Sequence, residues 1–512
     1  MTSHDYHNPI LCADYSDPDI VRVGDDFFMV SSSFNHMPAL PILHSTDLVN
    51  WQIINHVFQS LPLAGYNQYQ PGKGVWAPSI RWHDNQLWVF FSTPDEGIFM
   101  CRTDDPWGEW SVPHCVQPAK GWIDPCPFWD DNGDAWLVHA FAHSRSGIKH
   151  QLQLFAMSPD GTSLRGEGQI IYDGSSDQPT LEGPKVYKRG GWYYIFAPAG
   201  SVETGWETVL RARSMSGPWE AKNVLFQGNT PVNGPHQGGW VELDDGECWF
   251  VHFQDAHLYG RIVHLQPMRW EQDGWPRIGE PLGDDGAGQP VMRWPRPASL
   301  PPSPPLLPQT DDDFASGVPG LQWQWQWQAN PDPQWLLPGD GQLNLRCCEL
   351  PRGEEKQHFY WLPNLLLQKF PAWQFSAETT LTLNAEASGD AGGLVIYGER
   401  YAALLLEKRD GQSRLLWLTG WMSDAGVVRE RREVIATLDS TTCTMSVEVS
   451  HGGICRFAWR SGEANWQRVA QPFAAGKGKW VGAKVGLVAV SLESQAQRGS
   501  CSFNHFAIDI IG

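Results

Sequence analysis

The feature that most constrains the fold is a pattern that recurs five times in the first 290 residues. Each time, a polar turn is followed by a short run of aromatic and branched residues. The central aromatic residues of these runs lie 60, 48, 57 and 56 residues apart, at Phe28, Trp88, Trp136, Tyr193 and Trp249. A repeat of about 55 residues with about four strands per unit is typical of the blades of a β-propeller. The sequence therefore predicts an all-β fold whose first domain, residues 1–294, is a five-bladed propeller.

A proline-rich run separates this domain from the rest of the chain. Residues 295–309 contain seven prolines, which favour an extended polyproline II conformation and cannot pair inside a sheet. Residues 310–512 follow, with period-two alternation between Gly and Asp turns, and they predict a β-sandwich. In residues 321–327 the indoles of Trp323, Trp325 and Trp327 fall on one sheet face. Core packing explains them better than an exposed sugar-binding platform.

Composition and charge limit the partners. The 512 residues carry 37 basic and 57 acidic side chains, a net charge of −20, which argues against nucleic acid or an anionic membrane surface. We expect no membrane span, because no apolar run approaches about 20 residues, and no signal peptide, because the start lacks a basic and an apolar segment. The ten cysteines show no CxxC spacing, and Cys347 and Cys348 are adjacent. This pattern predicts reduced thiols in a cytoplasmic protein.

A polar or aromatic residue stands about 10 to 13 positions before each aromatic strand, in most cases beside a proline. The five residues are Asp17, Trp76, Asp124, Glu182 and His236. The first strand of every propeller blade lines the central axis, so we expect these side chains to occupy equivalent places and to converge at one mouth.

Three carboxylates at one mouth suit the cleavage of a glycosidic bond. One carboxylic acid must protonate the departing oxygen, and another carboxylate must activate water or attack carbon. A third negative charge raises the pKa of the acid, which keeps it protonated near neutral pH. Asp14 and Asp19 flank Asp17 and are rivals for its role, since Asp19 is two residues away and shares its face if the strand alternates regularly.

Several segments of the first domain resemble the family 43 glycoside hydrolases, which are five-bladed-propeller β-xylosidases and α-L-arabinofuranosidases. These segments are Asn8-Pro9-Ile10-Leu11, residues 16–26, residues 41–51, Gly74-Val75-Trp76-Ala77-Pro78, Ile123-Asp124-Pro125 and residues 181–188. They appear in the family's order. Residues 310–512 look like the concanavalin-like β-sandwich that is appended in the β-xylosidase branch.

The resemblance implies a role for each candidate residue. Asp17 matches the general base, Glu182 the general acid, and Asp124 the carboxylate that tunes and orients the acid. Arg261 resembles the arginine that binds the sugar near the carboxylates, and His236 the central histidine that holds water or a metal.

The resemblance also describes the reaction and its substrate. Phe34 and Trp76 resemble aromatic walls of the sugar subsite. The family inverts configuration and requires no cofactor. The implied activity is the exo-acting release of terminal β-D-xylose or α-L-arabinofuranose from xylo- or arabino-oligosaccharides, by an enzyme that could be a homo-oligomer. The family pattern is broken at Asp19, where the β-xylosidase branch often has Ser. It is also broken at residues 35–38, so the preferred sugar stays open.

Other readings of the chain lead to different functions. A non-catalytic polysaccharide-binding protein would use the Trp-rich sandwich, and a scaffold propeller would have no reason to keep three axial acids. A fructan hydrolase would carry an Asn-Asp-Pro-Asn entry motif, which the first blade lacks.

Two further features of the second domain are open. Residues 502–506 are a candidate loop at the active site. Asp311, Asp312 and Asp313 would suit structural Ca²⁺, although a solvated acidic turn explains them better.

Overall fold

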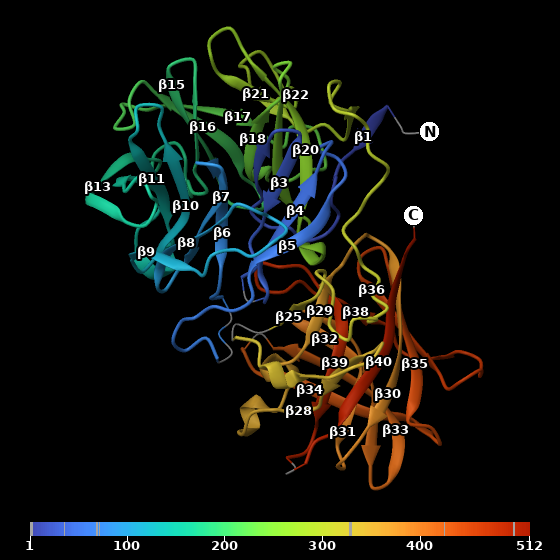
Figure 1. The fold of residues 1–512 in the computed structure, drawn as a ribbon. Helices are drawn as coiled ribbons and strands as arrows, with labels where there is room; N and C mark the ends of the chain where they lie inside the picture. Colours follow the sequence, from blue (N-terminus) through green and yellow to red (C-terminus); the bar gives the residue numbers. More distant parts are fainter. Residues whose placement is uncertain are drawn as a thin grey trace.

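The computed structural model describes residues 4–34, 36–67, 70, 72–326, 330–423, 425–494 and 497–511. It confirms the all-β prediction. In Figure 1 the propeller, coloured blue to green, lies against a β-sandwich coloured yellow to red. Trp327 and Asn35, which entered the sequence argument, lie outside the described residues.

Each blade is built on a four-stranded antiparallel meander, and the marker aromatic residues lie on its second strand. Blades 1 and 2 consist of β2 (Asp19–Val23), β3 (Asp26–Val30), β4 (Ala39–Ser45) and β5 (Gln52–Phe58), then β6 (Trp76–His83), β7 (Gln86–Thr93), β8 (Gly97–Thr103) and β9 (His114–Pro118). Blade 3 consists of β10 (Trp122–Trp129), β11 (Ala135–Phe141), β12 (Gln151–Met157) and β13 (Leu164–Asp173). Blades 4 and 5 consist of β14 (Lys185–Arg189), β15 (Trp192–Ala199), β16 (Trp206–Ala212) and β17 (Glu220–Leu225), then β18 (His236–Glu242), β19 (Cys248–Asp255), β20 (Arg261–Trp270) and β21 (Pro276–Ile278).

The ring closes where blade 5 meets blade 1. The first strands contact one another in the order β2, β6, β10 and β14, and β18 contacts β2. The N-terminal segment is held against blade 5: Leu11 pairs with Val263, and the Asn8 amide donates to Leu265 O at 2.7 Å. In addition β1 (Asp5–His7) pairs with β24 (Arg293–Pro295), and β22 (Glu280–Pro281) and β23 (Gly288–Gln289) extend the sheet of blade 4. The start of the chain therefore fixes the closure of the propeller.

The sandwich consists of two eight-stranded sheets. One contains β25 (Gln324–Trp325), β28 (Cys348–Glu349), β29 (Leu366–Lys369), β31 (Asp390–Tyr397), β32 (Arg400–Arg409), β33 (Gln412–Met422), β34 (Val428–Leu438) and β39 (Lys484–Ser491). The other contains β26 (Leu336–Leu337), β27 (Leu343–Arg346), β30 (Phe375–Asn384), β35 (Thr442–Ser450), β36 (Ile454–Arg460), β37 (Gln467–Arg468), β38 (Phe473–Ala474) and β40 (Ser500–Ile510). The alternation in β30 buries every second side chain, as the sequence predicts.

Helical elements are short throughout the described residues. They are α1 (His143–Ser146), η1 (His257–Tyr259), η2 (Pro333–Trp335), η3 (Glu354–Lys356) and η4 (Phe359–Trp361). No helix in this part of the chain has the length and apolar character needed to cross a membrane.

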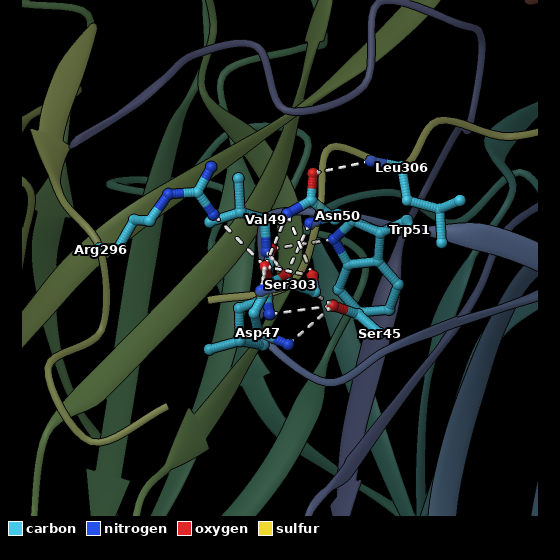
Figure 2. A network of polar contacts seen from close by, with 9 residues as sticks. Ser45, Asp47, Val49, Asn50, Trp51, Arg296, Ser303 and Leu306 are labelled. Carbon is cyan, nitrogen blue, oxygen red and sulfur yellow. Dashed lines mark hydrogen bonds and ion pairs between the residues drawn. The ribbon is translucent and has the colours of Figure 1, made fainter. Parts of the chain in front are cut away.

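The linker runs along blade 1 and is held there by one buried carboxylate. Figure 2 shows Asp47 accepting from the hydroxyl of Ser303 at 2.6 Å and pairing with Arg296 at 3.3 Å. Asn50 accepts from the backbone of Leu306 at 3.1 Å. The Asp47 network therefore attaches the proline-rich run to the propeller.

The aromatic and acidic residues at the start of the sandwich serve its own packing. Trp323 and Trp325 are buried in the sandwich core, as expected. Asp312 accepts from the indole of Trp323 at 2.9 Å, and Asp311 accepts from Ile508 N at 2.8 Å. These carboxylates cap turns and strands.

The two domains share a packed interface. Tyr259, on η1 of blade 5, is part of the sandwich core, and its hydroxyl donates to Trp373 O at 3.0 Å. Met37 of blade 1 pairs with Trp325. Side chains of the sandwich therefore lie close to the propeller face that carries Arg261.

Candidate active site

Each blade has a residue with positive φ just before its first strand or within the first residues of that strand. These residues are Asp17 (52°), Ala77 (27°), Asp124 (56°), Gly183 (57°) and Gln237 (42°). Four of them are non-glycine residues in a strained region of backbone conformation, which structures tolerate mostly at functional sites. The five turns define the mouth of the channel.

The positive-φ turns correct the expected register. Asp17 and Asp124 occupy the turn position itself, whereas Trp76, Glu182 and His236 come one residue earlier. The five residues are thus not at equivalent backbone positions. Counting back to the aromatic strands does not reveal this difference, because it depends on the irregular pairing near the start of β6, β10 and β18.

Asp17 is held by donors from two blades and is 5% exposed. Its Oδ1 accepts from the guanidinium of Arg261 at 3.1 Å. Its Oδ2 accepts from the hydroxyls of Ser16 at 3.0 Å and Ser32 at 2.5 Å. The Ser32 oxygen in turn accepts from Ala77 N at 2.8 Å. These bonds from a cation and two hydroxyls fix the orientation of the Asp17 carboxylate.

Asp124 and Glu182 lie beside each other in different environments. Asp124 is 4% exposed and accepts from Gly183 N at 2.8 Å. Burial, then the charges of Glu182 and Asp17, raise the pKa of Asp124 to about 8. The Glu182 side chain is 32% exposed, and its Oε1 lies 3.2 Å from Nε2 of the fully buried His236. Of these two carboxyl groups, Glu182 is therefore the one that a substrate can reach.

Aromatic rings from both domains surround the mouth. The ring of Phe34 lies 6.4 Å from that of Trp76, and Arg261 lies 5.8 Å from the Phe34 ring. Trp480 comes from the sandwich, on the loop before β39, and its ring lies 4.9 Å from Trp76 and 5.9 Å from Phe34. A cavity of about 360 Å³, lined in part by Arg261 and Trp480, continues between the domains beside this wall.

Both rivals of Asp17 are committed elsewhere. Asp19 is fully buried and pairs with Arg81 of blade 2 at 2.7 Å. Asp14 bonds to Lys484 of the sandwich at 3.2 Å. Neither carboxylate joins the group formed by Asp17, Asp124 and Glu182.

The surroundings of His236 do not fit a protein-bound metal. Its Nε2 faces Glu182, while Nδ1 is buried without a hydrogen-bond partner among the described residues. The backbone of Gly205 packs closely against His236 Nδ1. A Cβ added to Gly205 would lie 3.0 Å from this nitrogen. The described residues contain no group of three or more His, Cys, Asp or Glu side chains arranged to hold a metal. One histidine alone is a poor site for a metal ion.

Sequence reasoning missed several residues at the mouth. The sequence pointed only weakly to Ser16 and Ser32 as site residues, since both lie within a few residues of the first blade's turn or aromatic strand. Trp480 had none. The candidate loop 502–506 lies instead within β40, where Phe503 and Phe506 are buried in the sandwich core. The sandwich reaches the site through the loop that carries Trp480.

Comparison with known proteins assigns both domains. The model of glycosyl hydrolases family 43 matches residues 6–276, and that of the beta xylosidase C-terminal concanavalin A-like domain matches residues 311–509. A Xylanibacter ruminicola protein with a provisional beta-xylosidase name is 36% identical over 500 residues, covering 96% of this chain and 87% of that protein. A non-reducing end alpha-L-arabinofuranosidase of Bacteroides ovatus is 28% identical over 484 residues, which cover 87% of this chain and 85% of that protein. The crystal structure of a xylan beta-1,4-xylosidase from Bacillus halodurans shares the fold, with a TM-score of 0.86 and 24% sequence identity. The match covers 98% of this chain and 100% of that structure.

Proposed function

Because the chain belongs to glycosyl hydrolases family 43, we propose that it is an exo-acting, configuration-inverting glycosidase. Its substrates are short xylo- or arabino-oligosaccharides, from which it releases terminal β-D-xylose or α-L-arabinofuranose. The observation that carries the proposal is the group of three carboxylates at the channel mouth, in which Asp17 accepts a hydrogen bond from Arg261 and Glu182 is accessible. The names of the relatives include both a β-xylosidase and an α-L-arabinofuranosidase, which supports this pair of sugars.

The proposed reaction is a single displacement by water. Asp17 takes one proton from a water molecule while the water oxygen forms a bond to the anomeric carbon. The bond from that carbon to the departing oxygen breaks on the opposite face, and Glu182 donates its proton to this oxygen. Arg261 donates to Asp17 and orients it toward the water, and the Phe34, Trp76 and Trp480 rings pack around the terminal sugar.

Asp124 keeps a proton within the carboxylate group at neutral pH. Burial chiefly raises the pKa of Asp124, and the neighbouring charges of Glu182 and Asp17 raise it further. Glu182 lies next to Asp124, on the turn whose Gly183 N–H donates to Asp124 at 2.8 Å. The substrate reaches the proton through Glu182, since Asp124 is buried.

The state of the cysteines supports a proposal about the cellular location of the protein. All ten are unpaired thiols in the structure. We propose that it acts in the cytoplasm, on oligosaccharides small enough to be imported.

The decisive experiment compares three alanine variants on aryl β-D-xyloside and aryl α-L-arabinofuranoside. Asp17→Ala and Glu182→Ala should each lose at least about a hundredfold in kcat, and Asp124→Ala should lose a similar amount. Glu182→Ala should be least impaired when the leaving group is acidic, because such a group needs little protonation. NMR of the first-formed sugar should show inverted configuration.

Two results would overturn this function. One is activity within a few-fold of the parent in Asp17→Ala or Glu182→Ala. The other is binding of xylan or arabinan by the parent protein without any release of sugar, which would indicate a carbohydrate-binding protein.

A further inference from the structure

Asp14 is a propeller carboxylate whose hydrogen bonds reach both domains. It is 3% exposed. Its Oδ1 accepts from the backbone N–H of Arg261 at 2.9 Å. Its Oδ2 accepts from Gly482 N at 2.9 Å and from the ammonium of Lys484 at 3.2 Å. One side chain thus joins the first residue of β20 to the sandwich loop that enters β39.

Asp14 bonds to two segments, one in each domain, and each of them carries a residue of the proposed active site. The guanidinium of Arg261 donates to Asp17 at 3.1 Å and to Ser16 at 2.7 Å. Gly482 lies two residues after Trp480, whose ring is 4.9 Å from Trp76. Each end of the Asp14 bridge therefore leads directly to the mouth.

The backbones meet too closely at this point for side chains. A Cβ added to Gly260, which has φ of +78°, would lie 2.4 Å from Asp14 Cγ. A Cβ added to Gly482 would lie 2.6 Å from the carbonyl carbon of Tyr259. The neighbouring Ala483 N donates to Leu258 O at 2.7 Å. The contact is a close backbone fit, in which a shift of one loop moves the other.

Asp14 also pairs with a buried cation. Lys484 is 3% exposed, and the half-buried Lys369 lies in the same region, 5.2 Å from the ring of Tyr15. Burial would raise the pKa of Asp14, but Lys484, Lys369 and the two backbone donors together lower it. Removing the carboxylate leaves the ammonium of Lys484 without that partner, which is costly in a buried setting.

We propose that Asp14 is a positioning residue that sets Arg261 against Asp17 and Trp480 against Trp76, so that the sandwich domain is part of the catalytic apparatus. This inference rests on the proposed function for its kinetic readout. It predicts that loosening the contact between the domains changes the chemistry at Asp17 as well as the stability of the protein.

The test compares Asp14→Asn with Asp47→Asn in the full-length chain. The two carboxylates are similarly buried and each ties the propeller to a later segment, but Asp47 holds only the linker and its own turn. In Asp14→Asn the amide retains one acceptor oxygen and cannot serve both domains. We expect kcat/KM to fall about tenfold to a hundredfold. The acidic limb of the pH profile should move to higher pH, since the base loses part of its cationic support.

A second readout does not depend on activity. Hydrogen exchange of the Arg261 and Gly482 amides should become faster in Asp14→Asn and stay unchanged in Asp47→Asn. If Asp14→Asn does not fold, Lys484→Met carries the same test, with faster exchange at Gly482 expected.

The outcomes separate the two proposals. A parent protein that cleaves neither aryl glycoside refutes the proposed function, while hydrogen exchange still reports on Asp14. The positioning role is wrong if Asp14→Asn keeps the parent's pH profile and its exchange at both amides. It is also wrong if Asp47→Asn shifts the acidic limb to the same extent.

Discussion

Replacing Asp124 by Asn should abolish activity and at the same time make the protein more stable above neutral pH. In the unfolded chain an Asp loses its proton near pH 3.9. In the folded protein burial, together with the charges of Glu182 and Asp17, raises the pKa of Asp124 to about 8. Between these two values the folded state binds more protons than the unfolded state, so the free energy of unfolding falls as pH rises.

The size of the effect follows from the linkage. One group in this window changes the free energy of unfolding by about 1.4 kcal/mol per pH unit. Between pH 5.5 and 7.5 the parent should therefore lose about 3 kcal/mol relative to Asp124→Asn, which cannot ionise. The Asn oxygen can still accept from Gly183 N, so the hydrogen bond at 2.8 Å is kept. At roughly 2 °C per kcal/mol, the difference in melting temperature between the two proteins should change by about 5 °C over this range.

The assay is thermal unfolding of the parent, Asp124→Asn and Asp47→Asn at pH 5.5, 6.5 and 7.5. Asp47 is the matched control. Burial would raise its pKa, but hydrogen bonds from Ser303 and Asn50 outweigh burial and lower it. Both its folded and its unfolded forms are then ionised over this range, and its replacement should destabilise the protein equally at all three pH values. Parallel curves for the parent and Asp124→Asn would refute the reasoning.

Three further changes test other parts of the structure. Trp480→Ala should raise KM for an aryl xyloside about tenfold, because it removes one aromatic wall. The loss of stability should be small, since Trp480 is 37% exposed. An unchanged KM would show that Trp480 does not contribute to the sugar site. Asp19→Asn should cost about 3–5 kcal/mol of stability in chemical denaturation, because it leaves Arg81 buried without its charge partner; a cost below 1 kcal/mol would contradict a buried pair. Burial chiefly lowers the pKa of Lys369 to about 7, so the parent should gain stability from about pH 7 to pH 10, and Lys369→Met should flatten that rise; a rise of equal slope in both proteins would show that another group causes it.

The propeller could be predicted because its information is local. Each marker aromatic residue lies on the second strand of a blade, directly after a turn. Strand period, turn residues and a constant repeat length can all be read without knowing any long-range contact. The proline-rich run and the alternation after it mark the second domain in the same way.

The candidate residues were found by the same repeat, but their arrangement was not. Counting from the aromatic strands brings Asp17, Asp124 and Glu182 to one mouth. It does not show that Glu182 stands one residue before the turn position that the two Asp residues occupy. That difference depends on backbone torsion at the turn, and it decides which carboxyl group is buried and which is accessible.

The three neighbouring aspartates also differ only in their spatial partners. Asp14, Asp17 and Asp19 are similar in sequence terms, since each lies next to the first strand. Their partners come from far along the chain: Lys484 for Asp14, Arg261 for Asp17 and Arg81 for Asp19.

The sequence by itself determined the all-β class and the five-fold repeat followed by a sandwich, because these follow from short-range periodicity and from the geometry common to every blade. Only the tertiary structure decided that Trp480 reaches the mouth and that Asp14 joins the domains, since such contacts span more than 400 residues. They depend on how two independently patterned surfaces pack, and that complementarity has no periodic signature in the chain.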